Sequence, residues 1–403
     1  MSEQKQRTVL CFASYEKGAE FMRECKRQGC RVILLTSKSL EYAEWPRESL
    51  DQVFYIPDVN KEWNMNDVIY GVSYMARTED LDIIVALDDF DVEKAAAVRE
   101  HLRIPGMGDT TARYFRDKLA MRTRAKEVGI NVPEFIHVLN HNKINEFADR
   151  VPFPYVIKPR LQAGAIGIKK VHSKWEMWEV LNRLGDQQSF YLIEQFVPGD
   201  VFHVDSIIYG KKVVFQVASK YGKPPMEVSH QGRVFTSVTM DRNSEESKKI
   251  FEMNAEVLPA FGIVRGVSHS EYIRSENGEY YFLETSARVG GAHIAELVEA
   301  ASGVNLWAEW AKIELHPYDG IYEAPKDKGH FAGIMISLAK QEYPDTSSYN
   351  DPEVWWRMKK PNHVGLIVAS PDEARVNELV EKYTGRYYED FFATQPVPDK
   401  PSA

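Results

Sequence analysis

Two glutamates near residue 280 are the side chains whose types and spacing most directly suggest chemistry. Glu271 and Glu284 each lie in an apolar run, and the stretch between them contains Asn277-Gly278, a pair typical of tight turns. A hairpin of this length can set the two carboxylates side by side, where like charges repel unless a cation lies between them. Carboxylate oxygens are ligands that Mg²⁺ prefers. The pair therefore predicts a divalent-metal site, and an edge strand with ordinary ion pairs is the alternative.

Polar groups continue at alternate positions after Glu284. Because side chains alternate along a strand, Glu284, Ser286 and Arg288 are expected on one face. Gly290 and Gly291 follow, and backbone N–H groups exposed at the start of the next predicted helix favour binding of an anion. We expect that anion to be a carboxylate.

A lysine followed by a loop of small residues forms a second candidate site. Lys158 ends an apolar strand, and the loop 162–167 comes directly after it. Glycines let backbone N–H groups approach an anion closely, and a nearby lysine supplies a point charge. The segment is not a Walker A loop, because its lysine precedes the loop. An ordinary hairpin turn is the alternative interpretation of these small residues, Ala163, Gly164, Ala165 and Gly167.

A third candidate lies where an apolar strand runs into a turn at Pro198-Gly199. Such a connector can offer backbone donors and acceptors to a flat base, with a carboxylate nearby for a ribose or an exocyclic amine. The chain enters the turn through Glu194, Gln195, Phe196 and Val197 and returns through His203 and Asp205.

These segments, in this order, resemble the ATP-grasp superfamily over about residues 5–320. The resemblance implies that Lys158 and the upstream Lys118 hold the nucleotide phosphates. It also implies that the loop 162–167 closes over the phosphates as a lid, and that the connector 194–197 holds adenine, largely through its backbone. Lys118 alone would be interpreted as a solvated helix residue.

Two positions depart from the family pattern. Many members carry a ribose-binding Glu where this chain has Val201, so Asp205 or His203 is left to take that role. The third magnesium ligand is usually an Asn two residues after the second Glu, and here it is Ser286, a weaker ligand.

The other residues that match the family pattern are its metal ligands and a charge-stabilising arginine. The resemblance implies that Glu271 and Glu284 are the magnesium ligands and that Arg288 stabilises negative charge on the transferred phosphoryl group and the acyl phosphate. The catalytic residues are then Arg288 and Lys158. The implied cofactors are ATP and Mg²⁺, with Mn²⁺ as an alternative.

Glu227 and His230, three positions apart, suggest which branch of the superfamily is involved. The segment 224–232 resembles a hairpin of ATP-grasp L-amino-acid ligases and related carboxylate–amine ligases, where it contacts the amino-acid substrates. Ser229 replaces the family's glycine, and a solvated hairpin with an incidental histidine is an equal alternative. His269, two positions before Glu271, fits the same branch.

The function predicted from these motifs is ATP-dependent joining of a carboxylate and an amine through an acyl phosphate, with an amino acid as substrate. The expected partners are small molecules, and a homodimer is left open. Two alternatives stay open: a carboxylase-like or carbamoyl-phosphate-type enzyme that activates bicarbonate, and a nucleotide-binding protein without turnover. Amino-acid dependence of phosphate release separates the first from the ligase.

Strand and helix patterns alternate over roughly the first hundred residues. This alternation predicts a doubly wound parallel sheet in an α/β protein. Asp88 and Asp89 follow its third strand, at the carboxyl edge where such sheets bind ligands. A solvated acidic pair or a helix cap is the alternative. The expected strands are 8–13, 31–35 and 82–87, with helical patterns at 16–29 and 65–77.

We expect three units: a Rossmann-like pre-ATP-grasp domain over 1–107, an ATP-grasp domain over 108–321 with a lid subdomain at about 153–215, and a small α/β subdomain over 322–403. Single long helices are expected over 108–129 and 292–315.

Composition limits the classes of partner. The formal net charge is −9 and the basic residues are not clustered, which argues against nucleic acid. Apolar stretches are too short for a membrane span, and the start does not resemble a signal peptide, so a cytoplasmic location is expected. Cys11, Cys25 and Cys30 are expected to be free thiols rather than a zinc site.

Overall fold

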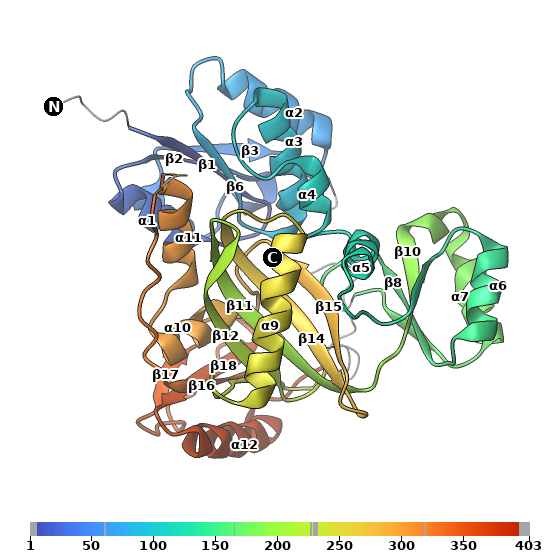
Figure 1. The fold of residues 1–403 in the computed structure, drawn as a ribbon. Coiled ribbons are helices and arrows are strands. Elements are labelled where there is room, and N and C mark those ends of the chain that lie inside the picture. The colour runs from blue at the N-terminus through green and yellow to red at the C-terminus, as the bar shows by residue number, and fades with distance from the viewer. Residues whose placement is uncertain are drawn as a thin grey trace.

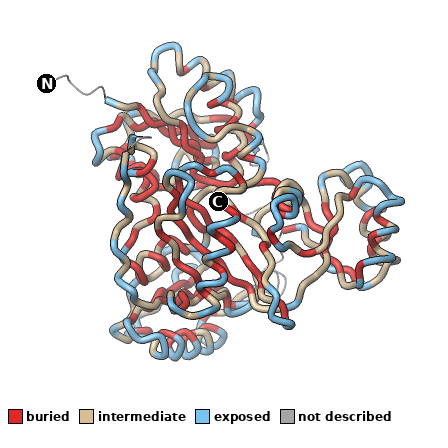
Figure 2. The backbone as a smooth tube through the Cα atoms, in the orientation of Figure 1, coloured by how far each residue is buried: buried red, intermediate tan, exposed pale blue. Residues whose placement is uncertain are grey.

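The computed structural model describes residues 6–59, 62–164, 166–225, 228, 233–317 and 320–394. An N-terminal sheet lies above a large mixed layer of strands and helices, and a smaller sheet with its own helices projects to one side (Figure 1). Buried residues follow the strands of all three parts (Figure 2). In the part of the chain described, no helix combines the length and the apolar character that crossing a membrane requires.

The N-terminal sheet is parallel, with strand order β3-β2-β1-β6. Helix α1 packs on one face with all three cysteines, which are buried and free, and α2 and α3 pack on the other. This confirms the predicted doubly wound α/β arrangement. The elements are β1 (Thr8–Ala13), α1 (Ala19–Arg27), β2 (Arg31–Ser37), β3 (Gln52–Ile56), α2 (Met65–Met75), β6 (Ile83–Ala86) and α3 (Val92–Leu102), with a short hairpin of β4 (Asp58–Val59) and β5 (Glu62–Trp63).

The projecting sheet has strand order β7-β10-β8-β9 and a separate core that includes Ile144, Tyr155 and Ile193. It differs from the lid expected at about 153–215, because it spans 135–195 and the residues after 198 join the large sheet. The reason is that β11 (Gly199–Tyr209) pairs on both sides, with β12 and β14, and is therefore an interior strand of that sheet. The elements are β7 (Phe135–His137), α6 (His141–Arg150), β8 (Tyr155–Pro159), β9 (Lys169–Val171), α7 (Lys174–Leu184) and β10 (Tyr191–Gln195).

The large sheet has eight strands in the order β15-β14-β11-β12-β13-β16-β18-β17, all antiparallel. Helices α9 and α12 pack on one face, and α10 and α11 on the other. The last eighty residues extend this sheet through the β13–β16 pair, and the domain boundaries given above stay predictions. The remaining strands are β12 (Lys212–Tyr221), β13 (Phe235–Thr239), β14 (Gly266–Ser275), β15 (Tyr280–Ser286), β16 (Phe331–Leu338), β17 (Val354–Arg357) and β18 (His363–Ser370).

Each of the two long helices expected from the sequence is divided in two. The region 108–129 forms α4 (Asp109–Arg113) and α5 (Lys118–Glu127), because the Asp117 side chain caps α5 by accepting from the N–H groups of Leu119 and Ala120. The region 292–315 forms α10 (Ile294–Ser302) and α11 (Leu306–Leu315), divided where Gly303 takes a left-handed conformation and Asn305 caps α11. The other helices are α9 (Glu245–Ala260) and α12 (Glu373–Asp390).

Candidate functional site

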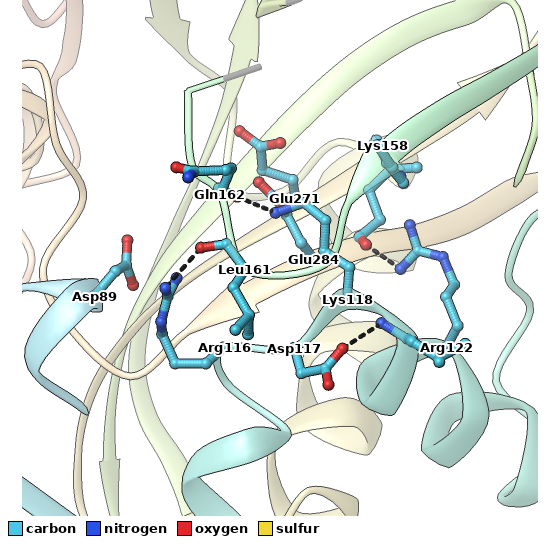
Figure 3. Close-up of polar contacts among 12 residues, drawn as sticks. Asp89, Arg116, Asp117, Lys118, Arg122, Lys158, Leu161, Gln162, Glu271 and Glu284 are labelled. Carbon is cyan, nitrogen blue, oxygen red and sulfur yellow. Dashed lines mark hydrogen bonds and ion pairs between the residues drawn. The ribbon is translucent and has the colours of Figure 1, made fainter. Parts of the chain in front are cut away.

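A cavity of about 470 Å³ lies between the projecting sheet and the large sheet, and we call it the lid-side cavity. Its charged lining comes from three places: the start of α5, the projecting sheet and the β14–β15 hairpin with its turn. These charged residues are Lys118, Lys158, Lys170, Glu194, Glu271, Glu276 and Glu284. In Figure 3 Lys118, Glu271 and Glu284 lie together at the centre, with Lys158 to one side. Residues more than one hundred positions apart thus meet at one wall.

The β14–β15 hairpin places the two glutamates directly opposite each other, as predicted. Tyr221 donates a hydrogen bond to Glu271 Oε1 at 2.8 Å, and Lys118 Nζ lies 2.7 Å from Glu284 Oε2. Burial alone would raise the pKa of Glu284, but the charge of Lys118 holds it below its usual value. Lys118 therefore already offsets part of the repulsion that led us to expect a metal. Magnesium binding by this pair stays a prediction.

Ser286 is the last residue of β15 and is half-buried opposite His269 in the ladder. This register puts it on the face that carries Glu284, two residues along the strand. The expected role as a third metal ligand stays a prediction.

Lys158 belongs to a buried ion-pair cluster that the sequence did not indicate. Its Nζ lies 2.7 Å from Glu194 Oε2, and the fully buried Arg122 donates to both Glu194 oxygens at 3.1 Å. Burial lowers the pKa of Lys158 despite the charge of Glu194. Burial would raise the pKa of Glu194, but the charges of Arg122 and Lys158 lower it. One feature of the sequence could have indicated Arg122: it follows Lys118 by four residues, which is one turn of α5.

The first residue of the small-residue loop and the residue before it are hydrogen-bonded to side chains at and just before the start of α5. Lys118 Nζ donates to the carbonyl of Gln162 at 2.7 Å, and Arg116 donates to the carbonyl of Leu161 at 2.6 Å (Figure 3). Gly164 lines the lid-side cavity, and Gly164 and Gly167 have φ values of 69° and 73°, in the region that favours glycine. Ala163 is half-buried beside them, and Ala165 lies outside the described residues.

The connector after β10 lies on the wall of the same cavity, through Gln195, Phe196 and Val197. Two of its backbone N–H groups are already used: Gln195 donates to the carbonyl of Glu134 at 2.8 Å and Phe196 to that of Pro154 at 2.9 Å. Lys170, which the sequence did not indicate, places Nζ 3.4 Å from the centroid of the Phe196 ring. The ammonium group of Lys170 therefore already lies over the connector's aromatic ring, and the adenine contact expected here stays a prediction.

His203 and Asp205 do not lie where a ribose contact was expected. Both are fully buried on β11, whereas Val201, on the same face of the strand, lines the cavity. Asp205 joins two imidazoles, with Oδ2 2.7 Å from His203 Nδ1 and Oδ1 2.9 Å from His269 Nδ1. The nitrogen and oxygen atoms of His203, Asp205 and His269 that could bind a metal lie within 4.8 Å of one another. The hydrogen bonds among the three side chains account for this proximity. Burial alone would lower the pKa of His269, but Asp205 raises it to about 9.

Arg288 pairs with the N-terminal unit. Its Nε donates to Asp89 Oδ2 at 2.8 Å and its Nη2 contacts the same oxygen, so Asp89 is ion-paired rather than solvated. Neither residue lines the lid-side cavity, and the expected catalytic role of Arg288 stays a prediction. The Asp89 side chain is buried and that of Arg288 is 11% exposed. Burial would raise the pKa of Asp89, but the charge of Arg288 holds it well below its usual range. Asp88 pairs with Lys17 and caps the short 3-10 helix Asp89–Asp91.

The two glycines after Arg288 differ in their surroundings. Gly290 is buried against Asp205 and His269, whereas Gly291 is half-buried with open space around it. Helix α10 begins three residues later, at Ile294. Glu227 and His230, the expected substrate residues, lie outside the described residues.

Comparison with known proteins agrees with this architecture. Residues 151–296 match the ATP-grasp domain family. The chain is 26% identical over 281 residues to the L-arginine-specific L-amino acid ligase of Bacillus subtilis, an alignment that covers 68% of this chain and 66% of that protein. It is 23% identical over 198 residues to a D-alanine–D-alanine ligase of Pseudomonas putida (strain GB-1), covering 47% of this chain and 61% of that one. The chain thus spans less than two thirds of the length of these relatives.

Solved structures share the fold over almost the whole chain. An L-amino acid ligase from Bacillus licheniformis superposes with a TM-score of 0.75 at 17% identity, over 97% of this chain and 100% of that one. The N5-carboxyaminoimidazole ribonucleotide synthetase of Thermotoga maritima superposes with a TM-score of 0.70 at 16% identity, over 96% and 99% of the two chains. The protein has the α/β ATP-grasp fold and contains an ATP-grasp domain.

Proposed function

We propose that the protein is an ATP-dependent carboxylate–amine ligase that forms an amide bond through an acyl phosphate. The observation that carries the proposal is the pairing of Glu271 with Glu284 on the wall of a cavity that also presents Lys118 and Lys158. A facing pair of carboxylates with two ammonium groups close by suits a nucleotide triphosphate with its metal ion.

The residues present fit both ligands. Glu271 and Glu284 would hold Mg²⁺, which supplies charge neutralisation at the phosphates when bound. Lys118 and Lys158 would hold phosphate oxygens, and to do so each would exchange a carboxylate partner, Glu284 or Glu194, for the nucleotide. The aromatic ring of Phe196 would lie against the base once Lys170, whose Nζ is 3.4 Å from the ring centroid, moves aside.

The proposed chemistry needs no nucleophile from the protein. A substrate carboxylate oxygen attacks the γ-phosphorus and ADP leaves; the amine nitrogen then attacks the acyl carbon, loses a proton and expels inorganic phosphate. The chain's part is to position the reactants and to neutralise charge. Arg288, held by Asp89, would stabilise the negative charge that develops on the phosphoryl oxygens.

An amino-acid substrate is the finer part of the proposal. It is supported by the similarity to the L-arginine-specific ligase and by the sequence pattern at Glu227 and His230. Arg288 and the amides of Gly290 and Gly291 would receive a carboxylate, while Glu227 would receive an ammonium group.

The test is phosphate release from ATP with amino-acid mixtures, with bicarbonate, or with neither, for wild type and Glu284→Gln. We expect release that depends on amino acids and falls by about 100-fold or more in the variant. Glu276→Gln is the matched control, because Glu276 is exposed and lines the same cavity outside the carboxylate pair. Release driven by bicarbonate alone would instead identify a carboxylase-type enzyme. ATP binding without release under any condition would identify a protein without turnover.

A further inference from the structure

A second and larger cavity, of about 670 Å³, lies between the N-terminal sheet and the large sheet. It runs along strand β6, and its opposite wall is formed by residues 262–267 and by Trp310 and Glu314 of α11. We call it the edge-strand cavity. Among the described residues it shares no lining side chain with the lid-side cavity, and its volume is in the range of small-molecule sites.

The wall formed by β6 is the open edge of a sheet. Strand β6 ends the order β3-β2-β1-β6, and among the described strands it pairs with β1 alone. All four of its residues, Ile83–Ala86, line the cavity. An edge strand presents backbone donors and acceptors in a row, which an extended peptide can match by adding a strand.

Charges of both signs line the cavity: three guanidinium groups, Arg7, Arg99 and Arg265, and two carboxyl groups, Asp82 and Glu314. Each arginine also donates to a carbonyl at 2.7 or 2.8 Å, to Leu315, Met107 and His316 respectively, which holds the guanidinium groups in place around the cavity.

Glu314 lies half-buried on the α11 wall of the edge-strand cavity. Trp310 Nε1 donates to its Oε1 at 2.9 Å, and burial raises its pKa even though Arg99 and Arg265 oppose that effect. Arg99 and Arg265 thus lie close enough to act on this carboxyl group, so charges of both signs meet at this part of the wall, and a further cation would favour the ionised form. The walls between the charged groups are apolar, and they include Ile263, Val264 and Val267.

We propose that the edge-strand cavity binds a short zwitterionic peptide, which lies along β6 with its carboxylate among the arginines and its ammonium group beside Glu314 and Asp82. The three parts of the wall each match one part of such a molecule: the strand edge matches the peptide amides, the opposite charges match the termini, and the apolar surface matches the side chains. The proposal concerns binding, and it stands whether or not the chain ligates amino acids.

The test measures binding of L-leucyl-L-leucine to the nucleotide-free full chain, by calorimetry and by hydrogen exchange. We expect binding that slows exchange in residues 83–86 and 262–267. N-acetyl-L-leucyl-L-leucine and L-leucyl-L-leucinamide each lack one terminal charge and should bind at least about tenfold more weakly, a loss of roughly 1.4 kcal/mol. Altering the ligand avoids mutating arginines that also hold the cavity wall.

A cavity-filling variant with a matched control completes the test. Val264→Trp should lower the affinity for the dipeptide by about tenfold or more, because the indole occupies the cavity. Val128→Trp is the control: Val128 is also 40% exposed but does not line the cavity. The proposal is overturned if Val264→Trp binds as wild type does, if the capped peptides bind equally well, or if residues 83–86 show no slowed exchange. If the wild-type protein releases no phosphate in response to amino acids, the ligase proposal fails and the peptide-binding proposal is unaffected.

Discussion

Among single residues, the ion pair between Asp89 and Arg288 links the N-terminal unit to the segment that follows β15. The two residues are 199 positions apart, and Asp89 Oδ2 accepts from Arg288 Nε while the other oxygen, Oδ1, is buried without a hydrogen-bond partner among the described residues. A largely enclosed guanidinium paired with a carboxylate depends on that partner for its orientation. Asp89 is therefore a positioning residue for Arg288.

We expect Asp89→Asn to lower kcat by about tenfold to 100-fold and to leave KM for ATP nearly unchanged, because Asp89 lies off the wall of the lid-side cavity. Asp89→Glu should recover part of the loss by restoring the charge. In an Arg288→Ala background the Asp89→Asn change should not lower kcat further, because the residue through which Asp89 acts is already absent. Steady-state phosphate release of the four proteins measures this cycle. Equal losses in both backgrounds would show that Asp89 does not act through Arg288.

At the scale of elements, the segment between β15 and α10 brings its backbone against the core of the large sheet. Gly290 lies where a Cβ atom would be 2.8 Å from Ile294 Cγ2. The same atom would be 2.9 Å from Asp205 Oδ1 and 3.0 Å from His269 Nδ1. The buried Asp205 and His269 thus set how closely the segment that carries Arg288 can approach the sheet.

Gly290→Ala should destabilise the protein by about 1–3 kcal/mol, because buried neighbours must shift to accept the methyl group. Turnover should fall with it, since Arg288 is two residues away. Gly291→Ala is the matched control, as a Cβ there meets nothing within 4 Å among the described residues. Urea unfolding and phosphate release of both variants measure the contrast. Similar behaviour of the two variants would contradict the steric argument.

At the scale of the whole molecule, the carboxyl edge of the N-terminal sheet carries a buried acid that links stability to pH. Asp91 is fully buried, and its Oδ2 accepts from the Ser14 N–H at 2.8 Å. Burial, together with the nearby Asp88, raises the pKa of Asp91 to about 6 from 3.8. Because the folded-state pKa lies above the unfolded one, the stability that the neutral carboxyl contributes is present below pH 3.8 and is lost as pH rises through about 6.

Asp91→Asn keeps an acceptor for Ser14 and removes the charge. We expect the variant to be more stable than wild type by up to about 3 kcal/mol near neutral pH, the free energy that corresponds to this change in pKa. The advantage should shrink as pH falls from about 6 toward 4. Urea unfolding midpoints across this range measure it, with the exposed Asp186→Asn as control. An advantage that does not change with pH would contradict the assignment to Asp91.

Features that depend on short stretches of chain could be predicted from the amino-acid sequence. The strand–helix alternation of the first hundred residues predicts the parallel sheet, and the spacing of Glu271 and Glu284 across Asn277-Gly278 predicts their pairing. Alternation of side chains and turn preferences act over a few residues, so a linear pattern is enough to read them.

Contacts between side chains far apart in the sequence could not be predicted in this way and became visible in the folded chain. Arg122 pairs with Glu194 across 72 positions and Arg288 with Asp89 across 199, and both pairings depend on which strands and helices become neighbours. The same is true of His203 and Asp205, whose place on the interior strand β11 buries them away from the lid-side cavity. Sheet order and packing are set by the summed burial of the whole chain, so no local pattern contains them.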